Sequence, residues 1–252
     1  MRYDCFKNKI ILITGSTSGF GKATAMLLAE NGAIVILNYA NNDERAIKAK
    51  EEIEKIGIVG ELIKADIGNE NDIANMFDII EKKYGKLDYL VNNAAADIEA
   101  EFENYPIKDF RRVMDVNLIG RFLCIQRAIP LMKKSISPRI INIASRFAER
   151  PIMNEAPLGI TEAGTVMLTK QSALELAKYN IRVNTVSPAL ARTALTESFM
   201  NEEGYAEYAK KNPSGRLCTT SDVANTIAFL LSEDGEYING ENVNVNGGIL
   251  LL

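Results

Sequence analysis

The chain has 252 residues, of which 47% are hydrophobic, and its 29 basic and 33 acidic residues give a formal net charge of -4. This length and apolar content are typical of one α/β domain, and we expect residues 1–252 to form it. A balanced charge without a basic block argues against binding to nucleic acid or to a membrane surface, so we expect a small-molecule partner.

Metal and membrane chemistry are also disfavoured by the residues present. The chain has no histidine, and Cys5, Cys124 and Cys218 are far apart without a CxxC pair, which argues against zinc and iron-sulfur sites. No apolar run approaches ~18 residues, and the first residues lack the pattern of a secretory signal. We therefore expect a cytoplasmic protein without a metal, in which proton transfer uses Tyr, Lys, Ser, Asp, Glu or Cys.

Short β-branched runs alternate with longer segments that have apolar residues at three- and four-residue spacing. In chain order the runs are "KIILIT", "AIVILNY", "LDYLVNN", "PRIINIAS", "IRVNTVS" and "NVNVNGG". This alternation predicts an α/β fold, with a doubly wound parallel sheet and helices on both faces. The segment at about 189–216 falls outside the alternation, and we expect it to be a lid or substrate loop.

The first strand is followed by a glycine-rich turn and an amphipathic helix. The turn contains Gly15, Gly19 and Gly21 in "ITGSTSGFGKATAMLLAENGA". Glycines allow the backbone to approach a pyrophosphate closely, and a helix N-terminus offers unpaired N–H groups to it. The pattern predicts a dinucleotide site, the alternative being a tight turn that binds nothing.

Six motifs spread along the chain support a family resemblance. They are "TGSTSGFG" (14–21), "NNAA" (92–95), "DVNLIG" (115–120), "INIAS" (141–145), "IRVNTVSPALART" (181–193) and the C-terminal stretch from 213 to 248. Together they resemble the single-domain short-chain dehydrogenase/reductases, close to the 3-oxoacyl-carrier-protein reductase branch. The resemblance covers nearly the whole chain. It implies a Rossmann-type sheet of about seven strands, an NAD or NADP cofactor, and a homodimer or homotetramer.

The resemblance also implies a set of cofactor-binding residues. Those at the pyrophosphate would be Gly15, Ser16, Ser18, Gly19, Phe20 and Gly21. Asp66 and Ile67 would line the adenine, and Asn92 and Ala94 the adjoining ribose. Pro188, Ala191 and Thr193 would reach the nicotinamide amide.

The choice between NAD and NADP depends on the end of the second predicted strand. Asn38 stands there in place of an acidic residue and is followed by Tyr39, and family members that read "NYA" at this place often use NADP. Ser18, by contrast, occupies a position that is frequently basic in NADP enzymes. These two cues conflict, and we favour NADP slightly over NAD.

The catalytic residues implied by the resemblance are incomplete. Ser145 and Asn117 match the serine and asparagine of the family, but "LGITEAG" falls where "YSASKAG" would be typical. Leu158 therefore takes the position of the proton-donating tyrosine, and Glu162 takes that of the lysine. Loss of a general acid typically removes ~10²- to 10⁴-fold of rate, so ordinary alcohol-carbonyl chemistry is poorly served.

The replacements leave several interpretations open. Glu162 could act as an acid or base, could accept hydrogen bonds from ribose hydroxyls, or could be a tolerated polar residue in an inactive site. Arg146, Arg150 and Arg192 could border the cleft and recruit an anionic substrate, or could form a solvated loop. Leu158 removes the hydroxyl, so Ser145 alone could polarise a carbonyl only weakly.

Two functions are consistent with these observations. The first is an atypical NAD(P)-binding oxidoreductase that acts on a small molecule in a specialised biosynthetic pathway, by unusual redox or non-redox chemistry. The second is a catalytically inactive homologue that serves as a structural or regulatory partner of an active one. The cofactor motifs favour the first, and the loss of Tyr and Lys favours the second.

Overall fold

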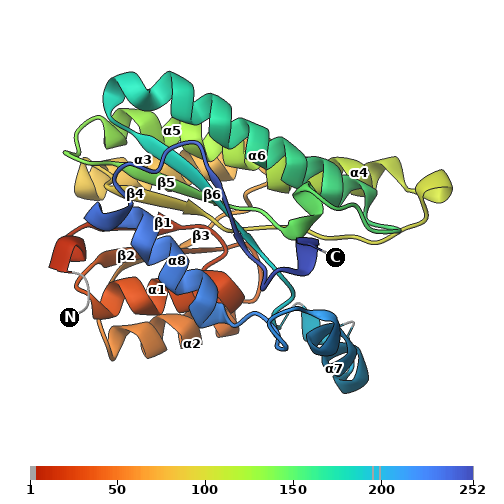
Figure 1. Cartoon of the computed structure of the whole chain (residues 1–252). Coiled ribbons are helices and arrows are strands. Elements are labelled where there is room, and N and C mark those ends of the chain that lie inside the picture. The colour runs from red at the N-terminus through yellow and green to blue at the C-terminus, as the bar shows by residue number, and fades with distance from the viewer. Residues whose placement is uncertain (1–3, 195, 199, 252) are drawn as a thin grey trace.

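The computed structural model describes residues 4–194, 196–198 and 200–251. Its centre is a seven-stranded parallel sheet in the order β3-β2-β1-β4-β5-β6-β7 (Figure 1). The strands are β1 (Ile10–Ile13), β2 (Ile34–Tyr39), β3 (Ile58–Lys64), β4 (Tyr89–Asn92), β5 (Arg139–Ile143), β6 (Arg182–Pro188) and β7 (Asn242–Val245). The predicted doubly wound Rossmann-type sheet is confirmed.

Helices cover both faces of this sheet. One face carries α1 (Gly19–Glu30), α2 (Asp43–Glu54) and α8 (Thr220–Leu231). The other carries α3 (Glu70–Tyr84), α4 (Ile107–Met114), α5 (Arg121–Met132) and α6 (Ala156–Leu176). Among the described residues, no helix is both long and apolar enough to cross a membrane.

The central strands are buried along their whole length. Every residue of β1, β4 and β5 is buried, as expected for parallel strands that have helices on both sides. The apolar side chains divide into two core clusters, one of which includes Ile11, Leu28 and Val91, and the other Leu12, Leu90 and Ile125. Adjacent residues of one strand thus pack into different cores, which holds the strand ends in fixed positions.

Strand β3 is absent from the six apolar runs that the sequence displays. It reads "IVGELIK" and pairs only with β2, at the edge of the sheet. Its residues are mostly half-buried, and Gly60 and Glu61 interrupt the apolar pattern. An edge strand has less need for a continuous apolar sequence, which explains why periodicity alone does not reveal it.

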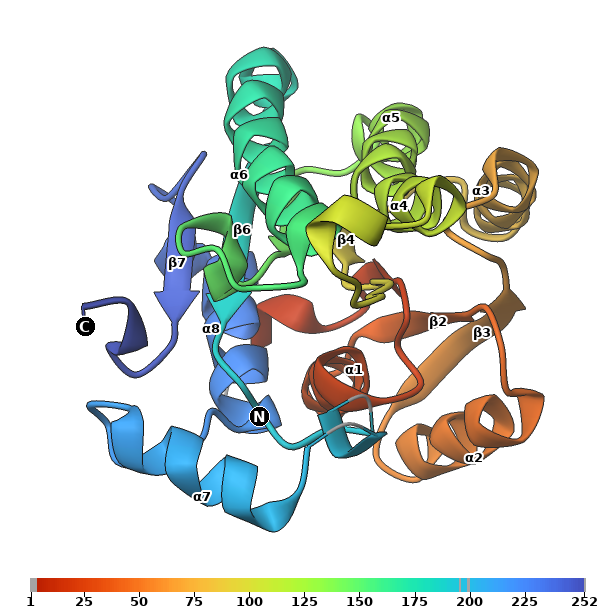
Figure 2. The ribbon, with the colours of Figure 1, turned by 90° about the vertical axis from the view of Figure 1, so that its right-hand side faces the viewer.

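The carboxyl ends of the strands meet on one side of the molecule, and Figure 2 looks onto this side. The strand order reverses between β1 and β4, and ligands of doubly wound sheets bind in the crevice at such a reversal. The segment 189–216 contains a short 3-10 helix, Thr196–Ser198, and the helix α7 (Glu202–Lys211). Figure 1 shows α7 beside the carboxyl ends of the strands.

Candidate cofactor and active site

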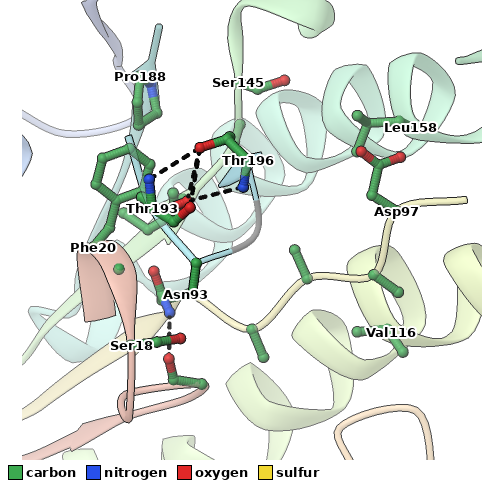
Figure 3. A pocket seen from close by; sticks show the side chains of 18 of the residues that line it. Ser18, Phe20, Asn93, Asp97, Val116, Ser145, Leu158, Pro188, Thr193 and Thr196 are labelled. Carbon is green, nitrogen blue, oxygen red and sulfur yellow. Dashed lines mark hydrogen bonds between the residues drawn. The ribbon is translucent and has the colours of Figure 1, made fainter. Parts of the chain in front are cut away.

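A cavity of about 860 Å³ lies along the carboxyl ends of the strands. It extends from the turn between β1 and α1 to the first turns of α6, and part of its lining is shown in Figure 3. Of the residues predicted for the cofactor, those on the cavity wall are Gly15, Ser18, Gly19, Phe20, Asn38, Asp66, Ile67, Ala94, Pro188, Ala191 and Thr193. Ser145, Leu158 and Glu162 are on the same wall. Residues from both halves of the chain therefore face one space.

The turn between β1 and α1 has the backbone shape that a pyrophosphate requires. Gly15 has φ +61°, and a Cβ added there would lie 2.9 Å from the Ala94 Cα. A Cβ on Gly21 would lie 2.5 Å from the Asn93 Nδ2. Ser18 precedes α1 without a side-chain hydrogen bond to it, so the first N–H groups of the helix are uncapped at the cavity wall. This cradle fits the pyrophosphate of a dinucleotide.

Hydrogen bonds of Ser16 and Asn38 join the glycine turn to the end of β2. The Ser16 hydroxyl accepts a hydrogen bond from the Asn38 N–H at 2.9 Å. The Asn38 side chain accepts from the Gly15 N–H at 3.1 Å and donates to the Ala65 carbonyl at 2.9 Å. Ser16 is fully buried and is absent from the cavity wall. Its hydroxyl therefore fastens β2 to the glycine turn.

The predicted adenine end contains an ion pair that the sequence did not indicate. Asp66 receives two hydrogen bonds of 2.9 Å from the guanidinium of Arg112, one to each carboxylate oxygen. Burial would raise the pKa of Asp66, but the hydrogen bonds from Arg112 and from the Gly68 N–H lower it below its usual value. Asp66 is consequently a fixed carboxylate beside Ile67 on the wall.

At the end of β4 the cavity is lined by Asn93, and Asn92 lies inside the sheet. The Asn92 amide donates to the Asn142 side chain at 2.9 Å, and Asn92 is buried. The Asn93 amide instead bonds to the carbonyls of Thr14 and Gly15 at 2.9 and 3.0 Å. Of the two asparagines in this motif, Asn93 is thus the one that can contact a ligand here.

Ser145 and Leu158 face the cavity near the end of β5. The Ser145 hydroxyl accepts a hydrogen bond from the Phe147 N–H at 3.1 Å and keeps its own proton for a ligand. Leu158 is 7% exposed and offers no polar atom to the cavity. In Figure 3 the Asp97 carboxyl points toward the Leu158 side chain.

Glu162 forms a buried ion pair with Arg121. Its two oxygens lie 3.2 and 3.5 Å from the Arg121 guanidinium nitrogens, and both side chains are nearly inaccessible to water. Arg121 also donates to the Thr165 hydroxyl at 2.6 Å. Burial raises the pKa of Glu162, and Arg121 opposes this rise. The charge of Glu162 is therefore balanced by an arginine that reaches the same cavity wall from α5.

Asn117 is in a π-helical turn, Asp115–Gly120, between α4 and α5. Its side chain accepts from the Ala96 N–H at 2.8 Å and donates to the Ala96 carbonyl at 2.9 Å. Asn117 is fully buried and is absent from the cavity wall. These contacts anchor the segment that carries Asp97.

Two carboxyl groups on the cavity wall each have one oxygen without a hydrogen-bond donor among the described residues. Asp97 Oδ1 and Glu155 Oε2 are both buried and unpartnered. Burial, followed by the neighbouring Asp97 carboxyl, raises the pKa of Glu155 to about 8. Among the described residues, no group of three or more His, Cys, Asp or Glu has the geometry to hold a metal ion.

The three arginines near the cleft have different environments. Arg146 lines the cavity and stacks over the Phe147 ring at 4.6 Å. Arg192 pairs with Glu202 at an exposed position, and Arg150 donates weakly to the Ile249 carbonyl at 3.4 Å. Only Arg146 of the three is on the cavity wall.

Several cavity residues escaped the sequence interpretation, namely Arg45, Asn93, Asp97, Arg112, Arg121, Glu155 and Tyr208. Arg121 is the first residue of the helix "RFLCIQRAIPLM", which also carries the exposed Arg127, so the sequence does not mark Arg121 as the buried one. The signal for Glu155 is its place just before α6. The others carry no local sequence signal, because tertiary structure alone brings them to the cavity.

Comparisons with known proteins agree with this geometry. A family model described as enoyl-(acyl carrier protein) reductase matches residues 15–250. The chain is 35% identical over 243 residues to the 3-oxoacyl-[acyl-carrier-protein] reductase FabG of Staphylococcus aureus, which covers 96% of this chain and 98% of that protein.

Solved structures give the same result. A short-chain type dehydrogenase/reductase from Mycobacterium marinum superposes with a TM-score of 0.90 and 30% identity, over 98% of this chain and 97% of that one. The Pseudomonas aeruginosa RhlG/NADP active-site complex superposes with a TM-score of 0.92 and 26% identity, over 99% of both chains. The chain belongs to the short-chain dehydrogenase/reductase family of oxidoreductases, within which it is similar to the 3-oxoacyl-[acyl-carrier-protein] reductases.

Proposed function

We propose that the chain is an NADP(H)-binding oxidoreductase that reduces the carbonyl group of a small molecule in a site without the tyrosine and lysine of its family. The observation that carries this proposal is the single cavity of about 860 Å³ that joins the uncapped glycine turn to Ser145. The RhlG structure was solved as an NADP complex, and the present chain has the same fold. A bound reduced nicotinamide would supply the hydride.

The cavity wall near the end of β2 supports NADP over NAD. Arg45, in the first turn of α2, is on this wall together with Asn41, and no carboxylate occupies the end of β2. A guanidinium there would pair with a ribose 2'-phosphate, whereas NAD binding favours an acidic residue at this place. Arg45 thus supplies the basic group that Ser18 lacks.

The chemical end of the cavity holds a carbonyl by hydrogen bonding and charge. The Ser145 hydroxyl accepts from the Phe147 N–H, and no hydrogen bond among the described residues uses its proton, so it can donate to a carbonyl oxygen. Arg121, oriented by Glu162 and Thr165, brings a positive charge to the wall where the family lysine would stand. The substrate itself would be selected by segment 189–216, which contributes Met200 and Tyr208 to the wall.

A second function, that of an inactive partner of an active homologue, is favoured by one observation. Among the described residues, the tyrosines on the cavity wall are Tyr39 and Tyr208, and neither follows the serine strand at the spacing typical of the family. A protein that only keeps the fold would tolerate Leu158 and the Arg121–Glu162 pair without catalysis.

Both functions are compatible with self-association. The outer sides of the π-helical turn, α5 and α6 carry exposed apolar side chains, which are Ile119, Phe122, Ile160, Met167 and Leu174. Several large apolar groups on neighbouring helices favour coverage by another protein surface. We propose that a second copy of the chain covers them, and light scattering combined with gel filtration measures the resulting mass.

The function is tested by binding and turnover measured separately. Fluorescence titration with NADPH and NADH measures cofactor binding, and NADPH oxidation is then followed with a short 3-oxoacyl thioester and with simple ketones. We expect tight NADPH binding with slow but measurable oxidation. Binding without any oxidation would favour the inactive partner, and absence of binding to either dinucleotide at millimolar concentration would contradict both the cofactor and the activity.

A further inference from the structure

The strongest unexplained feature of the cavity is its carboxyl pair beside Leu158. Glu155 precedes α6 by one residue and is three residues before Leu158. Asp97 belongs to the segment after β4, and Asn117 anchors that segment through Ala96. Figure 3 shows the Asp97 carboxyl directed at the Leu158 side chain. Two acids from distant parts of the chain are thus held where the family places its proton donor.

The unpartnered oxygens indicate that this pair holds a proton. Asp97 Oδ1 and Glu155 Oε2 are buried without a donor, and Glu155 is 8% exposed. Two ionised carboxylates in such contact repel each other, and each loses its hydration without compensation. One proton shared between them removes the repulsion and gives both oxygens a hydrogen bond, as in other carboxyl dyads.

A second observation, on a different element, indicates that a reactant completes this end of the cavity. Arg121 is 1% exposed and is on the same wall, yet its Nε has no hydrogen-bond partner. A buried guanidinium N–H left without an acceptor is costly. The cavity therefore offers an unused donor near Glu162 and a protonated carboxyl near Leu158, both of which a bound polar molecule could satisfy.

We propose that the Asp97–Glu155 pair is the proton donor of this site and takes the place of the missing tyrosine. This assignment rests on the proposed carbonyl reduction and names the group that completes it. The protonation state is consistent with it, because burial and Asp97 raise the pKa of Glu155 to about 8, which keeps one proton on the pair at neutral pH. A general acid is most effective when its pKa is close to the working pH.

The proton transfer balances as follows. When bound, a reduced nicotinamide would supply a hydride, which is one proton with two electrons, to the carbonyl carbon and would itself be oxidised. The O–H bond of the shared carboxyl breaks, its electron pair remains on the carboxylate, and the proton forms a new O–H bond on the carbonyl oxygen. Ser145 donates a hydrogen bond to that oxygen while its negative charge develops. Glu99 is exposed and lies close enough to Glu155 to raise the pKa of its carboxyl. In this proposal Glu99 passes a proton from the solvent to the pair after each reaction.

Other charged and titratable groups face this pair. Glu99 is on the same segment as Asp97. The Tyr105 hydroxyl donates to the Ile98 carbonyl, and burial, followed by nearby carboxyls that include Asp97 and Glu155, raises the pKa of Tyr105. Burial and, to a smaller extent, Asp97 raise the pKa of Glu162, but Glu162 is paired with Arg121, which opposes this rise. Since Glu162 is compensated and Glu99 is exposed, removing the proton from the pair is expected to dominate the pH dependence of proton transfer.

One alternative proton donor is present in the cavity. Tyr208, on α7, is on the wall and its buried hydroxyl has no hydrogen-bond partner. The Arg146 guanidinium lies 5.6 Å from the centre of its ring. Tyr208→Phe removes this hydroxyl without altering the carboxyl pair, and it therefore serves as the competing variant.

The test combines a titration with a turnover measurement. Infrared difference spectroscopy and carboxyl-carbon NMR follow protonated side-chain carboxyls from acidic to alkaline pH, in the full chain without substrate. We expect one carboxyl to stay protonated at neutral pH and to titrate with a midpoint of about 8. This signal should vanish in Glu155→Gln, shift to lower pH in Asp97→Asn, and remain in the control Glu103→Gln, which changes an exposed acid outside the cavity.

The turnover measurement uses NADPH and an acetoacetyl thioester in single-turnover mode. Glu155→Gln is expected to slow the reaction by ~10²- to 10⁴-fold with unchanged NADPH affinity, while the control Glu103→Gln keeps the wild-type rate. Loss of the rate in Tyr208→Phe but not in Glu155→Gln overturns the proposal, as does an active wild type without the titrating carboxyl. A titrating carboxyl in a protein that binds NADPH and oxidises none contradicts the proposed reduction as well as the donor assignment.

Discussion

The two ends of the cavity are built by different means. The cofactor end consists mostly of backbone, namely a glycine turn, an uncapped helix start and strand ends joined by Asn38. The chemical end consists of side chains from separate elements, with Arg121 paired to Glu162 and Asp97 placed against Glu155. Backbone geometry at the first end tolerates little variation, whereas the second end can exchange its functional groups as long as charge and hydrogen bonding remain balanced.

Under the proposed function, this difference explains how a chain can keep the cofactor half of its family's site and change the chemical half. A Cβ on Gly15 or Gly21 would collide with residues of the segment after β4, so the turn has no alternative sequence at those positions. At the other end Glu162 is paired with Arg121, which brings a positive charge from a neighbouring helix. These two residues therefore form one unit at the second end.

The largest expected effect comes from breaking that unit. Arg121→Met leaves Glu162 buried without its partner and should lower the free energy of unfolding by ~3–5 kcal/mol. Adding Glu162→Met should recover most of this loss, because a buried apolar pair has no unpaired charge. Urea unfolding of both single variants and the double variant measures the coupling. Arg192→Met, which breaks the exposed pair with Glu202, is the matched control and should cost less than ~1 kcal/mol.

The next expected effect concerns repair of the family motif. Leu158→Tyr with Glu162→Lys would place a lysine against Arg121, so this double variant should be poorly stable and should gain little activity. The triple variant with Arg121→Leu removes the repulsion and should raise ketone reduction by ~10²-fold over the wild type. Steady-state rates and thermal unfolding are measured together. Equal gains in the double and triple variants would show that Arg121 does not oppose the lysine.

The features that could be predicted from the sequence are those that depend on local motifs. Gly15, Gly19 and Asp66 belong to local motifs, and the structure places all three on the cavity wall, with Gly21 packed behind them against Asn93. The alternation of strands with helices, which predicts a parallel sheet covered on both faces, follows from strand and helix periodicity. These features depend on neighbours within a few residues, and a single sequence displays them directly.

Other features depend on residues far apart in the chain. Arg121 and Glu162 are separated by 41 positions, and nothing local links Asp97 to Glu155. The sequence also does not reveal that Asn93, one residue after Asn92, is the asparagine on the wall, because Asn92 still belongs to strand β4 and is buried there. Strand β3 was missed for a related reason, since it lies at the sheet edge and pairs with β2 alone.

A smaller expected effect is a change in how stability depends on pH. The pKa of Glu155 is raised to about 8 in the folded chain, against ~4.3 for an unfolded glutamate. The stabilisation from its proton is therefore complete below the unfolded value and is lost as pH rises through the folded value. Glu155→Gln should flatten the fall in stability between these values, as measured by unfolding at several pH values. A wild type whose stability is level across this range would contradict a proton held by the pair.

The smallest expected effect is on cofactor choice. Arg45→Gln should weaken NADPH binding by about tenfold, equivalent to ~1.4 kcal/mol, while NADH binding changes little. The control is Arg111→Gln, which alters an exposed arginine outside the cavity. Calorimetric titration with both dinucleotides gives the ratio of the dissociation constants for NADPH and NADH in each variant. A similar loss for NADH would show that Arg45 does not contact the 2'-phosphate.

The most direct test of the account is a crystal structure of the chain with NADPH bound. The account predicts the pyrophosphate at the N-terminus of α1, the 2'-phosphate at Arg45, and an ordered nicotinamide between Ser145 and the Asp97–Glu155 pair. The Arg121–Glu162 contact should be intact, with the Arg121 Nε directed at the cofactor or a water bound to it. A structure with NADPH bound elsewhere, or with its nicotinamide excluded from the space beside Leu158, would contradict the account.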